Sequence, residues 1–209
     1  MMENENKRLE QKLSGYYKMH APIYDLTRWS FLFGRIDILK KLQIPEKPYH
    51  VWEIGCGTGK NLSFLLKKHP TISCLGLDTS SEMIQIAKNK LKKYGQTCSI
   101  LNTTYKVNHT EDWEKPDLIL FSYSLSMINP GWKELLEQAR RDLKPGGHIA
   151  VVDFHQSNFS GFKKWMRLNH VEMNGHLLPV LESLFTPTQK EIKSAYLGIW
   201  KYLLFIGEK

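Results

Sequence analysis

The sequence predicts an α/β protein built around a mainly parallel β-sheet, and two observations support this prediction. Apolar runs alternate with stretches of helical spacing between residues 50 and 154. The first apolar run leads into Gly55, Gly57 and Gly59, and a helical stretch follows directly. Such alternation implies parallel βαβ units with right-handed crossovers. A glycine-rich turn between a strand and a helix is typical of the ligand crevice of a doubly wound sheet.

The alternating region is predicted to contain five strands and the helices that connect them. The strands are expected at residues 50–54, 72–78, 98–101, 117–123 and 148–154, and the helices at 61–68, 81–93 and 133–142. Ser80 is the expected N-cap of the helix at 81–93, because its hydroxyl can accept a hydrogen bond from a free backbone N–H. The helix at 133–142 is expected to stop at Leu143-Lys144-Pro145-Gly146-Gly147, since proline and glycine end helices and form turns.

The segment before this region follows another pattern. Residues 3–20 are predicted to form a polar helix, and Pro22 disfavours helix at the residue that precedes it. Ser30 is the expected cap of a further helix, because apolar residues follow it at helical spacing. These apolar residues are Phe31, Leu32, Ile36, Leu39 and Leu42.

The segment after the alternating region is less regular. Residues 162–169 and 177–184 are expected to be helical. Residues 195–206 are aromatic and apolar, and they form either one long strand or two elements with a bend at Gly198 or Lys201. An antiparallel edge added to the parallel sheet would fit this pattern.

Length and composition predict a single domain of ordinary globular type. The chain has 209 residues, of which 42% are hydrophobic and 24% charged. No apolar run reaches the roughly 20 residues that a membrane span requires, and residues 1–13 lack the apolar stretch of a signal peptide. Cys56, Cys74 and Cys98 are odd in number and lack CxxC spacing. They are therefore expected to be buried thiols in the cytoplasm rather than disulfides or ligands of zinc.

The charge of the chain leaves its partner open. Lys and Arg number 29 against 21 Asp and Glu, which gives a formal charge of +8. An excess of this size favours anionic partners such as a membrane surface or nucleic acid. A solvated, lysine-rich surface would give the same count.

Two common nucleotide-binding motifs do not fit the glycine turn. A P-loop requires GxxxxGK[ST], but Ile54 stands five positions before Gly59 and Asn61 follows Lys60. A dinucleotide-binding turn requires GxGxxG, but the sixth position counted from Gly55 is Lys60. The turn therefore belongs to neither class of phosphate-binding site.

Glu53 directly before GxGxG, together with Asp78 at the end of the second strand, resembles the class I S-adenosylmethionine-dependent methyltransferases. Three further features fall in the order of this family: residues 78–83 (DTSSEM), the strand led by Asp117, and the LKPGG turn. The resemblance implies a three-layer Rossmann-like fold with a mostly parallel seven-stranded sheet and an antiparallel C-terminal strand. We expect one domain over residues 1–209, with 1–48 as a helical lid and 49–209 as the cofactor-binding core.

The resemblance implies that S-adenosylmethionine binds at this turn. Backbone at the three glycines can approach the methionine end without a side-chain clash. Asp78 can accept both ribose hydroxyl protons or can instead cap the next helix, and Met83 can lie on the adenine face. Glu53 is expected to organise the loop or to reach the cofactor amino group through water. Thr103 stands at the position where the family usually has an acidic residue that binds the adenine amine. The predicted cofactor residues are Tyr16, Glu53, Gly55, Cys56, Gly57, Gly59, Asp78, Thr79, Met83, Thr103, Thr104 and Ser122; no metal is expected.

A narrower resemblance lies outside the cofactor turn. Residues 16–35 (YYKMHAPIYDLTRWSFLFGR), residues 121–128 (FSYSLSMI) and residues 152–154 (VDF) are similar to the bacterial diacylglycerylhomoserine N-methyltransferases of betaine-lipid synthesis. This resemblance implies three successive methyl transfers to the homoserine amine. The phosphatidylethanolamine N-methyltransferases share the YxxxAPxYD character of the first stretch, so their substrate is the alternative.

Tyrosines would suit the acceptor pocket of such an enzyme, because their rings attract cations and their hydroxyls can hold an amine. Tyr17, Tyr24 and Tyr123 are the candidates, and His20 or Asp25 is the candidate proton acceptor. The aromatic residues could instead form the core face of a lid helix. Weaker candidates at strand ends are Ser126, Asp153 and His155.

An amine-bearing lipid substrate also implies contact with an anionic membrane surface, on the inner face of the membrane. The apolar residues 31–33 could lie in that interface, beside the basic residues Arg28, Arg35, Lys40 and Lys41. A core-packed helix with solvated lysines is the other reading. The enzyme that makes diacylglycerylhomoserine is a further expected partner. Nucleic acid is not expected, because the chain lacks an NPPY-like tetrad. A soluble-amine methyltransferase and a non-catalytic cofactor-binding module remain as alternatives.

Overall fold

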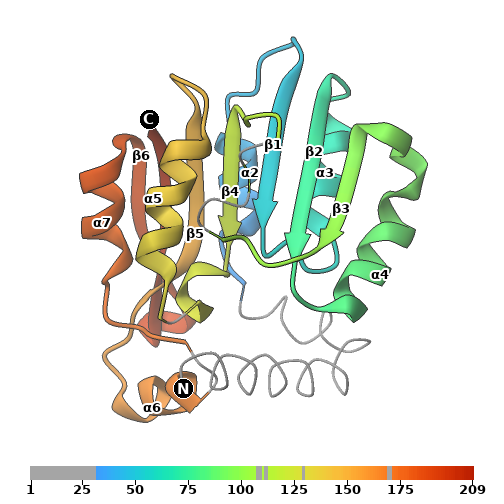
Figure 1. The fold of residues 1–209 in the computed structure, drawn as a ribbon. Helices are drawn as coiled ribbons and strands as arrows, with labels where there is room; N and C mark the ends of the chain where they lie inside the picture. The colour runs from blue at the N-terminus through green and yellow to red at the C-terminus, as the bar shows by residue number, and fades with distance from the viewer. Residues whose placement is uncertain (1–31, 107–109, 111–112, 129, 169–170) are drawn as a thin grey trace, which may run out of the picture.

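A seven-stranded sheet forms the centre of the molecule, with strand order β3-β2-β1-β4-β5-β7-β6 (Figure 1). The computed structural model describes residues 32–106, 110, 113–128, 130–168 and 171–209. The strands are β1 (Tyr49–Ile54), β2 (Ile72–Asp78), β3 (Cys98–Asn102), β4 (Leu118–Ser122), β5 (His148–Gln156), β6 (Thr186–Ala195) and β7 (Trp200–Glu208).

The strand directions confirm the predicted fold class. Strand β1 pairs in parallel with β2 and β4, and the parallel pairing extends to β3 on one side and β5 on the other. Strand β7 pairs antiparallel with both β5 and β6, so β7 alone of these seven strands runs against the rest. The sheet is therefore mostly parallel, with an antiparallel C-terminal strand.

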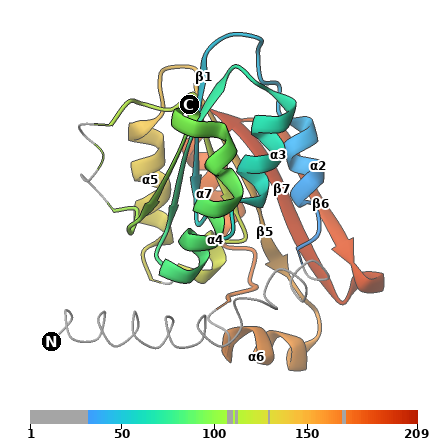
Figure 2. The same ribbon diagram turned by 90° about the vertical axis from the view of Figure 1, so that its right-hand side faces the viewer.

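Helices cover both faces of the sheet and give three layers (Figure 2). The helices are α2 (Arg35–Lys41), α3 (Lys60–Lys68), α4 (Ser81–Leu91), α5 (Trp132–Asp142), α6 (Ser160–Leu168) and α7 (Leu177–Leu184), with 3-10 turns η1 (Lys92–Thr97), η2 (Leu125–Met127) and η3 (Tyr196–Gly198). Val51 packs in a core with α2, α3 and α4, whereas the next residue, Trp52, packs in a second core with α5 and α7. Successive strand residues point to opposite faces, so near-continuous apolar strands build both cores.

Most of the elements between residues 50 and 154 lie where the sequence predicts them, because their signals are local. The Ser80 hydroxyl accepts a hydrogen bond from the Met83 N–H at 3.3 Å and caps α4, as expected. Helix α5 ends at Asp142, and Gly146 adopts a positive φ of 71° in the following turn. Helix α4 is shorter than predicted, since the chain tightens into η1 after Leu91.

The predicted start of the helix before β1 is wrong. Helix α2 begins at Arg35 and has Gly34 as its N-cap, with a φ of 78° that favours glycine. Ser30 and Phe31 lie outside the described residues, and Leu32 precedes the helix. The side chains of Ile38 and Leu39 are fully buried in the same core as Val51. Helix α2 therefore packs as part of the core, although the sequence assigned residues 1–48 to a lid.

The sequence missed strand β6, which forms the edge of the sheet. Residues 186–195 are largely polar, and their partly buried positions alternate with exposed ones along much of the strand. Charged side chains on an edge strand protect it from pairing with another chain, and the same charges hide it from an apolar pattern. Gly198 has a φ of 95° and lies in the bend between β6 and β7. Of the two predicted alternatives, one long strand or two elements with a bend, the second is correct.

The carboxyl ends of the parallel strands meet at one edge of the sheet, which is the lower edge in Figure 1. The glycine turn after β1 lies there, and both ribbon views also place α6 and the turn between β6 and β7 at this end. Ligands of open α/β sheets bind at such an edge. Among the residues that the structure describes, no helix is both long and apolar enough to cross a membrane.

Candidate functional site

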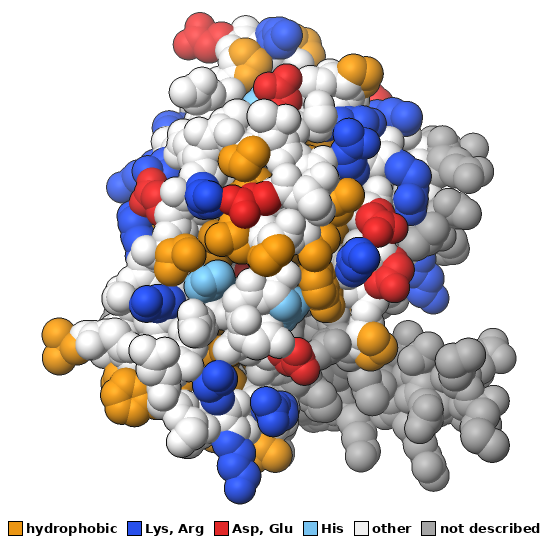
Figure 3. All heavy atoms as spheres, turned by 90° about the vertical axis from the view of Figure 1, so that its left-hand side faces the viewer, with side chains coloured by type: hydrophobic (Ala, Val, Ile, Leu, Met, Phe, Trp, Pro, Cys, Tyr) orange, Lys and Arg blue, Asp and Glu red, His pale blue; other side chains and the backbone are white. Residues whose placement is uncertain are grey.

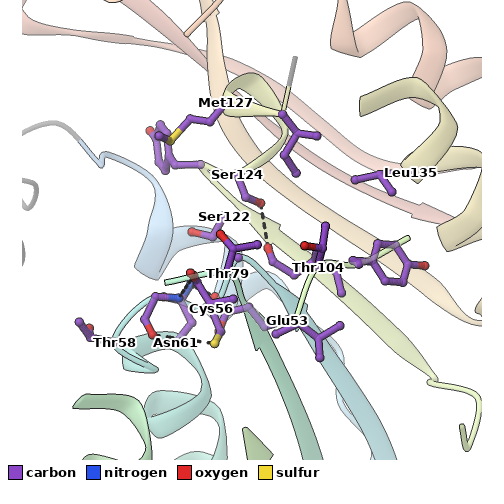
Figure 4. A pocket seen from close by; sticks show the side chains of 18 of the residues that line it. Glu53, Cys56, Thr58, Asn61, Thr79, Thr104, Ser122, Ser124, Met127 and Leu135 are labelled. Atoms are coloured by element: carbon purple, nitrogen blue, oxygen red, sulfur yellow. Dashed lines mark hydrogen bonds between the residues drawn. The ribbon is translucent and has the colours of Figure 1, made fainter. Parts of the chain in front are cut away.

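A pocket of about 200 Å³ opens to solvent at this edge of the sheet. Its walls come from the turn after β1, from the ends of β2, β3 and β4, from η2 and from the segment that leads into α2. In Figure 4 the polar residues Glu53, Cys56 and Asn61 lie toward one end of the pocket, and Met127 and Leu135 lie toward the other. The pocket thus has a polar half and an apolar half.

The backbone N–H groups of the glycine turn donate hydrogen bonds within the protein. The N–H groups of Gly55 and Cys56 both donate to the Leu77 carbonyl, at 2.8 and 2.9 Å, and the Gly59 N–H donates to the Cys56 carbonyl. The Gly57 N–H donates to Oδ2 of Asp78 at 2.8 Å. A phosphate-binding turn needs free N–H groups, whereas these four N–H groups are engaged within the protein. The geometry agrees with the exclusion of both phosphate motifs.

The glycines of the turn have different roles. A Cβ on Gly57, at a φ of 52°, would meet no atom within 4 Å, and this residue lines the pocket. A Cβ on Gly59 would lie 2.7 Å from Cδ1 of Leu91, so Gly59 allows α3 and α4 to pack closely and does not line the pocket. Gly55 lines the pocket and packs tightly on Ser124, whose Cβ would be 2.6 Å away from an added Cβ.

Asp78 closes β2 and lines the pocket at the place the sequence predicts. Its Oδ2 accepts from the Gly57 N–H, and its Oδ1 accepts from the Ser80 N–H at 2.9 Å. Each carboxylate oxygen has a second lone pair, so the side chain is held by backbone and can still accept from a ligand. The cap of α4 is Ser80 and not Asp78, so the alternative role of Asp78 as a helix cap does not hold.

Glu53 is buried at the bottom of the polar half and is 1% exposed. Its Oε1 accepts a hydrogen bond from Nδ2 of Asn61 at 2.6 Å, whereas Oε2 is buried and has no hydrogen-bond partner. Burial raises the pKa of this carboxyl from its usual 4.5 to about 8, although the hydrogen bond from Asn61 opposes the shift. Glu53 thus links the end of β1 to α3 across the glycine turn.

Arg35 and Asn61 are two pocket residues that the sequence did not predict. Nη2 of Arg35 donates to Oδ1 of Asn61 at 3.0 Å, so the hydrogen bonds run from α2 through Asn61 to Glu53. Asn61 had a local signal, since it lies in the first turn of the helix behind the glycines. Arg35 had none, because the contact of α2 with the turn is a tertiary contact.

Two serines at the end of β4 shape the middle of the pocket. The Ser124 hydroxyl donates to the Ile54 carbonyl at 2.8 Å and fixes the chain after β4 against β1. The Ser122 hydroxyl is buried and unpartnered in the pocket wall, as is Oε2 of Glu53. Buried polar atoms normally have hydrogen-bond partners. Two such atoms in one pocket wall indicate a polar ligand.

Tyr123 lines the pocket but holds a different bond from the one predicted. Its hydroxyl donates to the Phe33 carbonyl at 2.6 Å, its backbone has a φ of 57°, and its side chain is 3% exposed. Burial, and to a lesser extent nearby Asp153, raises the pKa of the hydroxyl well above its usual value. The hydroxyl proton therefore joins the end of β4 to the segment before α2, and a ligand amine could only donate to the oxygen.

The adenine end is only partly as predicted. Thr79, Thr103 and Thr104 line the pocket beside Asp78, and the Thr103 N–H donates to the Asp78 carbonyl at 3.0 Å. Met83 is 1% exposed and does not line the pocket, because the first turn of α4 points this side chain inward. Its position therefore does not support the prediction that Met83 lies on the adenine face of the cofactor.

Ser126, Asp153 and His155 do not line the pocket, contrary to the prediction from their strand ends. The Ser126 N–H and hydroxyl both donate to the carboxylate of Asp153, which holds η2 in place. Burial raises the pKa of Asp153 to about 6, although the bonds from Ser126 oppose the shift. His155 packs against Gly175. These residues support the pocket wall from behind.

Several predicted residues lie outside the described part of the chain. They are Tyr16, Tyr17, His20, Tyr24 and Asp25. Cys56 lines the pocket, and burial raises the pKa of its thiol well above the usual value. Cys56 and Cys74 are buried free thiols as expected, and Cys98 is partly exposed.

Known proteins that resemble the chain agree with this geometry. Residues 52–149 match the family model described as a methyltransferase domain. The [4+2]-cyclase SpnF superposes with a TM-score of 0.75 at 13% identity, over 96% of each chain. The chain has the class I methyltransferase fold. The family match supports a class I methyltransferase, although the same fold in a cyclase shows that the reaction must be argued from the site.

Curated relatives match over different lengths of this methyltransferase fold. Trans-aconitate 2-methyltransferase of Acidovorax sp. (strain JS42) is 29% identical over 119 residues, which are 56% of this chain and 42% of that protein. Demethylmenaquinone methyltransferase of Listeria welshimeri is 24% identical over 195 residues, which are 87% of this chain and 77% of that protein. The chain thus spans less than half the length of the first of these relatives.

Proposed function

We propose that this protein is an S-adenosylmethionine-dependent N-methyltransferase that methylates the amine of diacylglycerylhomoserine three times, giving the trimethylated betaine lipid. The cofactor is S-adenosylmethionine. The observation that carries the cofactor part of this assignment is the turn, whose N–H groups donate within the protein, next to the buried carboxyl of Glu53, whose Oε2 has no hydrogen-bond partner. An amino acid ammonium suits such a site, and a phosphate does not.

The residues of the polar half fit the cofactor. Backbone at Gly55 and Gly57 would hold its amino acid end, and Asp78 would accept from the ribose hydroxyls. Thr79, Thr103 and Thr104 lie on the side where the adenine would sit, with a hydroxyl in place of the usual acid. When bound, the cofactor supplies a methyl group on a sulfonium that a neutral amine can attack.

The apolar half supports an acceptor that carries apolar groups. Its side chains include Leu32, Met127, Ile128 and Leu135. Residues 16–35 and 121–128 are the two longer stretches that resemble the diacylglycerylhomoserine N-methyltransferases. The first stretch contributes Leu32 and Arg35 to the pocket wall. The second contributes several residues, including Tyr123 and Met127. Two stretches about 90 residues apart thus meet in one pocket, which supports an acceptor site formed by both.

The reaction requires alignment and loss of protons. Three transfers to a primary ammonium release three protons and leave a permanent positive charge on the nitrogen. Holding the amine in line with the methyl group supplies much of the acceleration. The Tyr123 hydroxyl cannot take the proton, because it is itself protonated and donates to Phe33. Tyr17, Tyr24 and His20 keep their predicted roles as amine-holding and proton-accepting groups.

Other acceptors are alternatives to the homoserine lipid. The names of the two curated relatives refer to trans-aconitate and demethylmenaquinone, so related chains act on chemically different molecules. Phosphatidylethanolamine is the second candidate, because residues 16–25 share the character of its methyltransferases. The enzyme that makes diacylglycerylhomoserine is the proposed protein partner, and we propose a cytoplasmic location.

The test is a transfer assay with the purified full chain and S-adenosylmethionine labelled in its methyl group. Diacylglycerylhomoserine and phosphatidylethanolamine are each supplied in detergent micelles and ethanolamine is supplied in the same buffer, and the products are identified by mass spectrometry. Mono-, di- and trimethylated homoserine lipid are expected. Transfer only to phosphatidylethanolamine or ethanolamine would replace the proposed acceptor, and cofactor binding without any transfer would contradict methyl transfer itself.

A pair of variants checks that the described pocket is the one used. Asp78→Asn should weaken binding of S-adenosylhomocysteine by tenfold or more, since a charged hydrogen-bond acceptor is lost, at a cost of about 1.5–3 kcal/mol. Asp37→Asn is the matched control, because Asp37 lies on the exposed side of α2 and pairs with Lys193 at 3.7 Å. Equal affinities for the two variants would place the cofactor elsewhere.

A further inference from the structure

We infer that a surface beside the pocket docks on a lipid bilayer that contains anionic lipids. The surface is built on an aromatic cluster of Phe33, Phe162, Trp165, Tyr196 and Trp200. Trp200 is buried at its base, and Phe33, Trp165 and Tyr196 are exposed. Phe162 stacks on Trp200 with ring centroids 5.1 Å apart and contacts Trp165 at 5.7 Å. Tyr196 lies 4.8 Å from Trp200 and 5.3 Å from Phe33. The cluster joins α6, the β6–β7 turn and the segment before α2 into one face.

Large apolar side chains project from the rim of this aromatic cluster. Leu197 is fully exposed at the tip of the β6–β7 turn, and Leu168 and Phe159 at the two ends of α6 are 74% and 56% exposed. Tyr196 and Leu197 have positive φ values of 46° and 56°. Bulky residues seldom adopt such values, so the turn holds an apolar side chain out in solvent at a conformational cost. Exposed apolar groups that gather in this way mark an interaction site.

The charges around the cluster identify the partner as an anionic lipid surface. Lys163, Lys164 and Arg167 lie on α6, and Lys201 is exposed on β7. Residues 154–171 and 192–207 contain no Asp or Glu. The acid that follows α6, Glu172, accepts a hydrogen bond from Asn174. Figure 3 shows hydrophobic and basic side chains together at the lower end of this face. Aromatic anchors beside basic residues are the features of peripheral membrane binding.

The aromatic cluster continues into the pocket. Phe33 belongs to the cluster, and its carbonyl accepts the Tyr123 hydroxyl at 2.6 Å. Leu32, the residue before it, lines the apolar half of the pocket, as does Tyr123. A bilayer against the cluster would therefore lie beside the acceptor end of the pocket, where a lipid headgroup must enter.

This surface differs from the basic face that the sequence predicts around residues 31–33. Arg35 turns toward the pocket and binds Asn61, and Lys41 pairs with Glu191 at 2.7 Å. Those two side chains are engaged within the protein, whereas Lys40 is exposed. Arg28 and Phe31 lie outside the described residues. The docking proposal rests on the proposed lipid substrate for its purpose, but vesicle binding can be measured without methyl transfer.

The test is sedimentation of the full chain with vesicles at low salt, using phosphatidylcholine alone or mixed with phosphatidylglycerol. The wild type should sediment with the mixed vesicles and much less with phosphatidylcholine alone. The variants Leu168→Ser/Leu197→Ser and Lys164→Glu/Arg167→Glu should each lower the partition coefficient about tenfold or more. All four residues are exposed, so the fold should tolerate the changes.

Matched controls make the same changes elsewhere. Leu101→Ser/Ile192→Ser and Lys67→Glu/Lys88→Glu replace exposed residues on β3, β6, α3 and α4, and should leave vesicle binding unchanged. The proposal would be overturned if the wild type did not sediment with the mixed vesicles. It would also be overturned if the control variants lost as much vesicle binding as the surface variants. Loss of a wild-type dimer in the surface variants, without vesicle binding, would assign the surface to a second copy of the chain.

A transfer assay separates this proposal from the proposed function. If vesicles bind but no amine lipid is methylated, the docking surface stands and the proposed function falls. If micellar diacylglycerylhomoserine is methylated but vesicles do not bind, the proposed function stands and the docking surface falls. If both hold, the surface variants should lose activity on vesicle lipid and retain it on micellar lipid.

Discussion

Glu53 links the stability of the protein to pH at the scale of a single residue. The folded state raises its pKa from 4.5 to about 8, so between these values the folded protein holds a proton that the unfolded chain releases. The free energy of unfolding therefore falls as the pH rises through this range. Glu53→Gln removes the titrating group and should stabilise the cofactor-free protein at pH 8 by about 2 kcal/mol or more, since one pKa unit corresponds to about 1.4 kcal/mol.

Urea unfolding of wild type and Glu53→Gln at pH 5 and pH 8 measures this effect. The two proteins should differ little at pH 5 and clearly at pH 8. Glu46→Gln is the control, because Glu46 is exposed before β1 and its replacement should leave the pH profile of the wild type unchanged. Parallel profiles for wild type and Glu53→Gln would show that the carboxyl ionises normally.

The turn between β1 and α3 is an element in which neighbouring glycines have separable roles. Gly59→Ala should lower the free energy of unfolding by about 1–3 kcal/mol, because its Cβ would crowd Leu91 and its φ is 70°. Gly57→Ala has strain from a φ of 52° but open space around its Cβ. Its free energy of unfolding should fall by about 1–2 kcal/mol at most. The substitution should also weaken the binding of S-adenosylhomocysteine, because the new methyl group would occupy the pocket.

Thermal unfolding and calorimetric titration of the two variants measure the contrast, and each variant serves as the control for the other. Gly59→Ala should lose more stability and bind the ligand with near wild-type affinity, whereas Gly57→Ala should lose less stability and bind the ligand more weakly. Unchanged affinity in Gly57→Ala would show that the cofactor does not approach the turn.

At the scale of the whole molecule, the Tyr123 hydroxyl joins the end of β4 to a residue 90 positions earlier in the chain. This bond ties the segment before α2 to the pocket and to the aromatic cluster. Tyr123→Phe should lower the free energy of unfolding by about 1 kcal/mol, the usual net value of one hydrogen bond. Amide exchange should become faster in α2, while the strands β1 to β5 should remain protected.

Tyr94→Phe is the matched control for this prediction. The Tyr94 hydroxyl also donates to a backbone carbonyl, that of Ser63, but at 3.4 Å, which is long for such a bond. Its removal should change little. Equal effects of both substitutions on exchange in α2 would mean that the Tyr123 bond does not hold this segment.

The sequence by itself determined the features that depend on neighbouring residues. The strand before the glycines, the Ser80 cap and the helix end at Asp142 follow from local geometry, and the alternation of strands and helices determined the parallel sheet. The place of Asp78 at the pocket followed as well, because the carboxyl ends of parallel strands meet at one edge.

Only the tertiary structure decided which side chains meet across the chain. It brought Arg35 to Asn61, placed Met83 in the interior and joined α6 to the β6–β7 turn through stacked rings. It also showed that polar residues 186–195 form an edge strand. These outcomes depend on packing between elements, and a local pattern contains no record of the partner that a side chain meets on another element. The likeness to methyltransferases thus comes from the local pattern, and the docking surface from the packing.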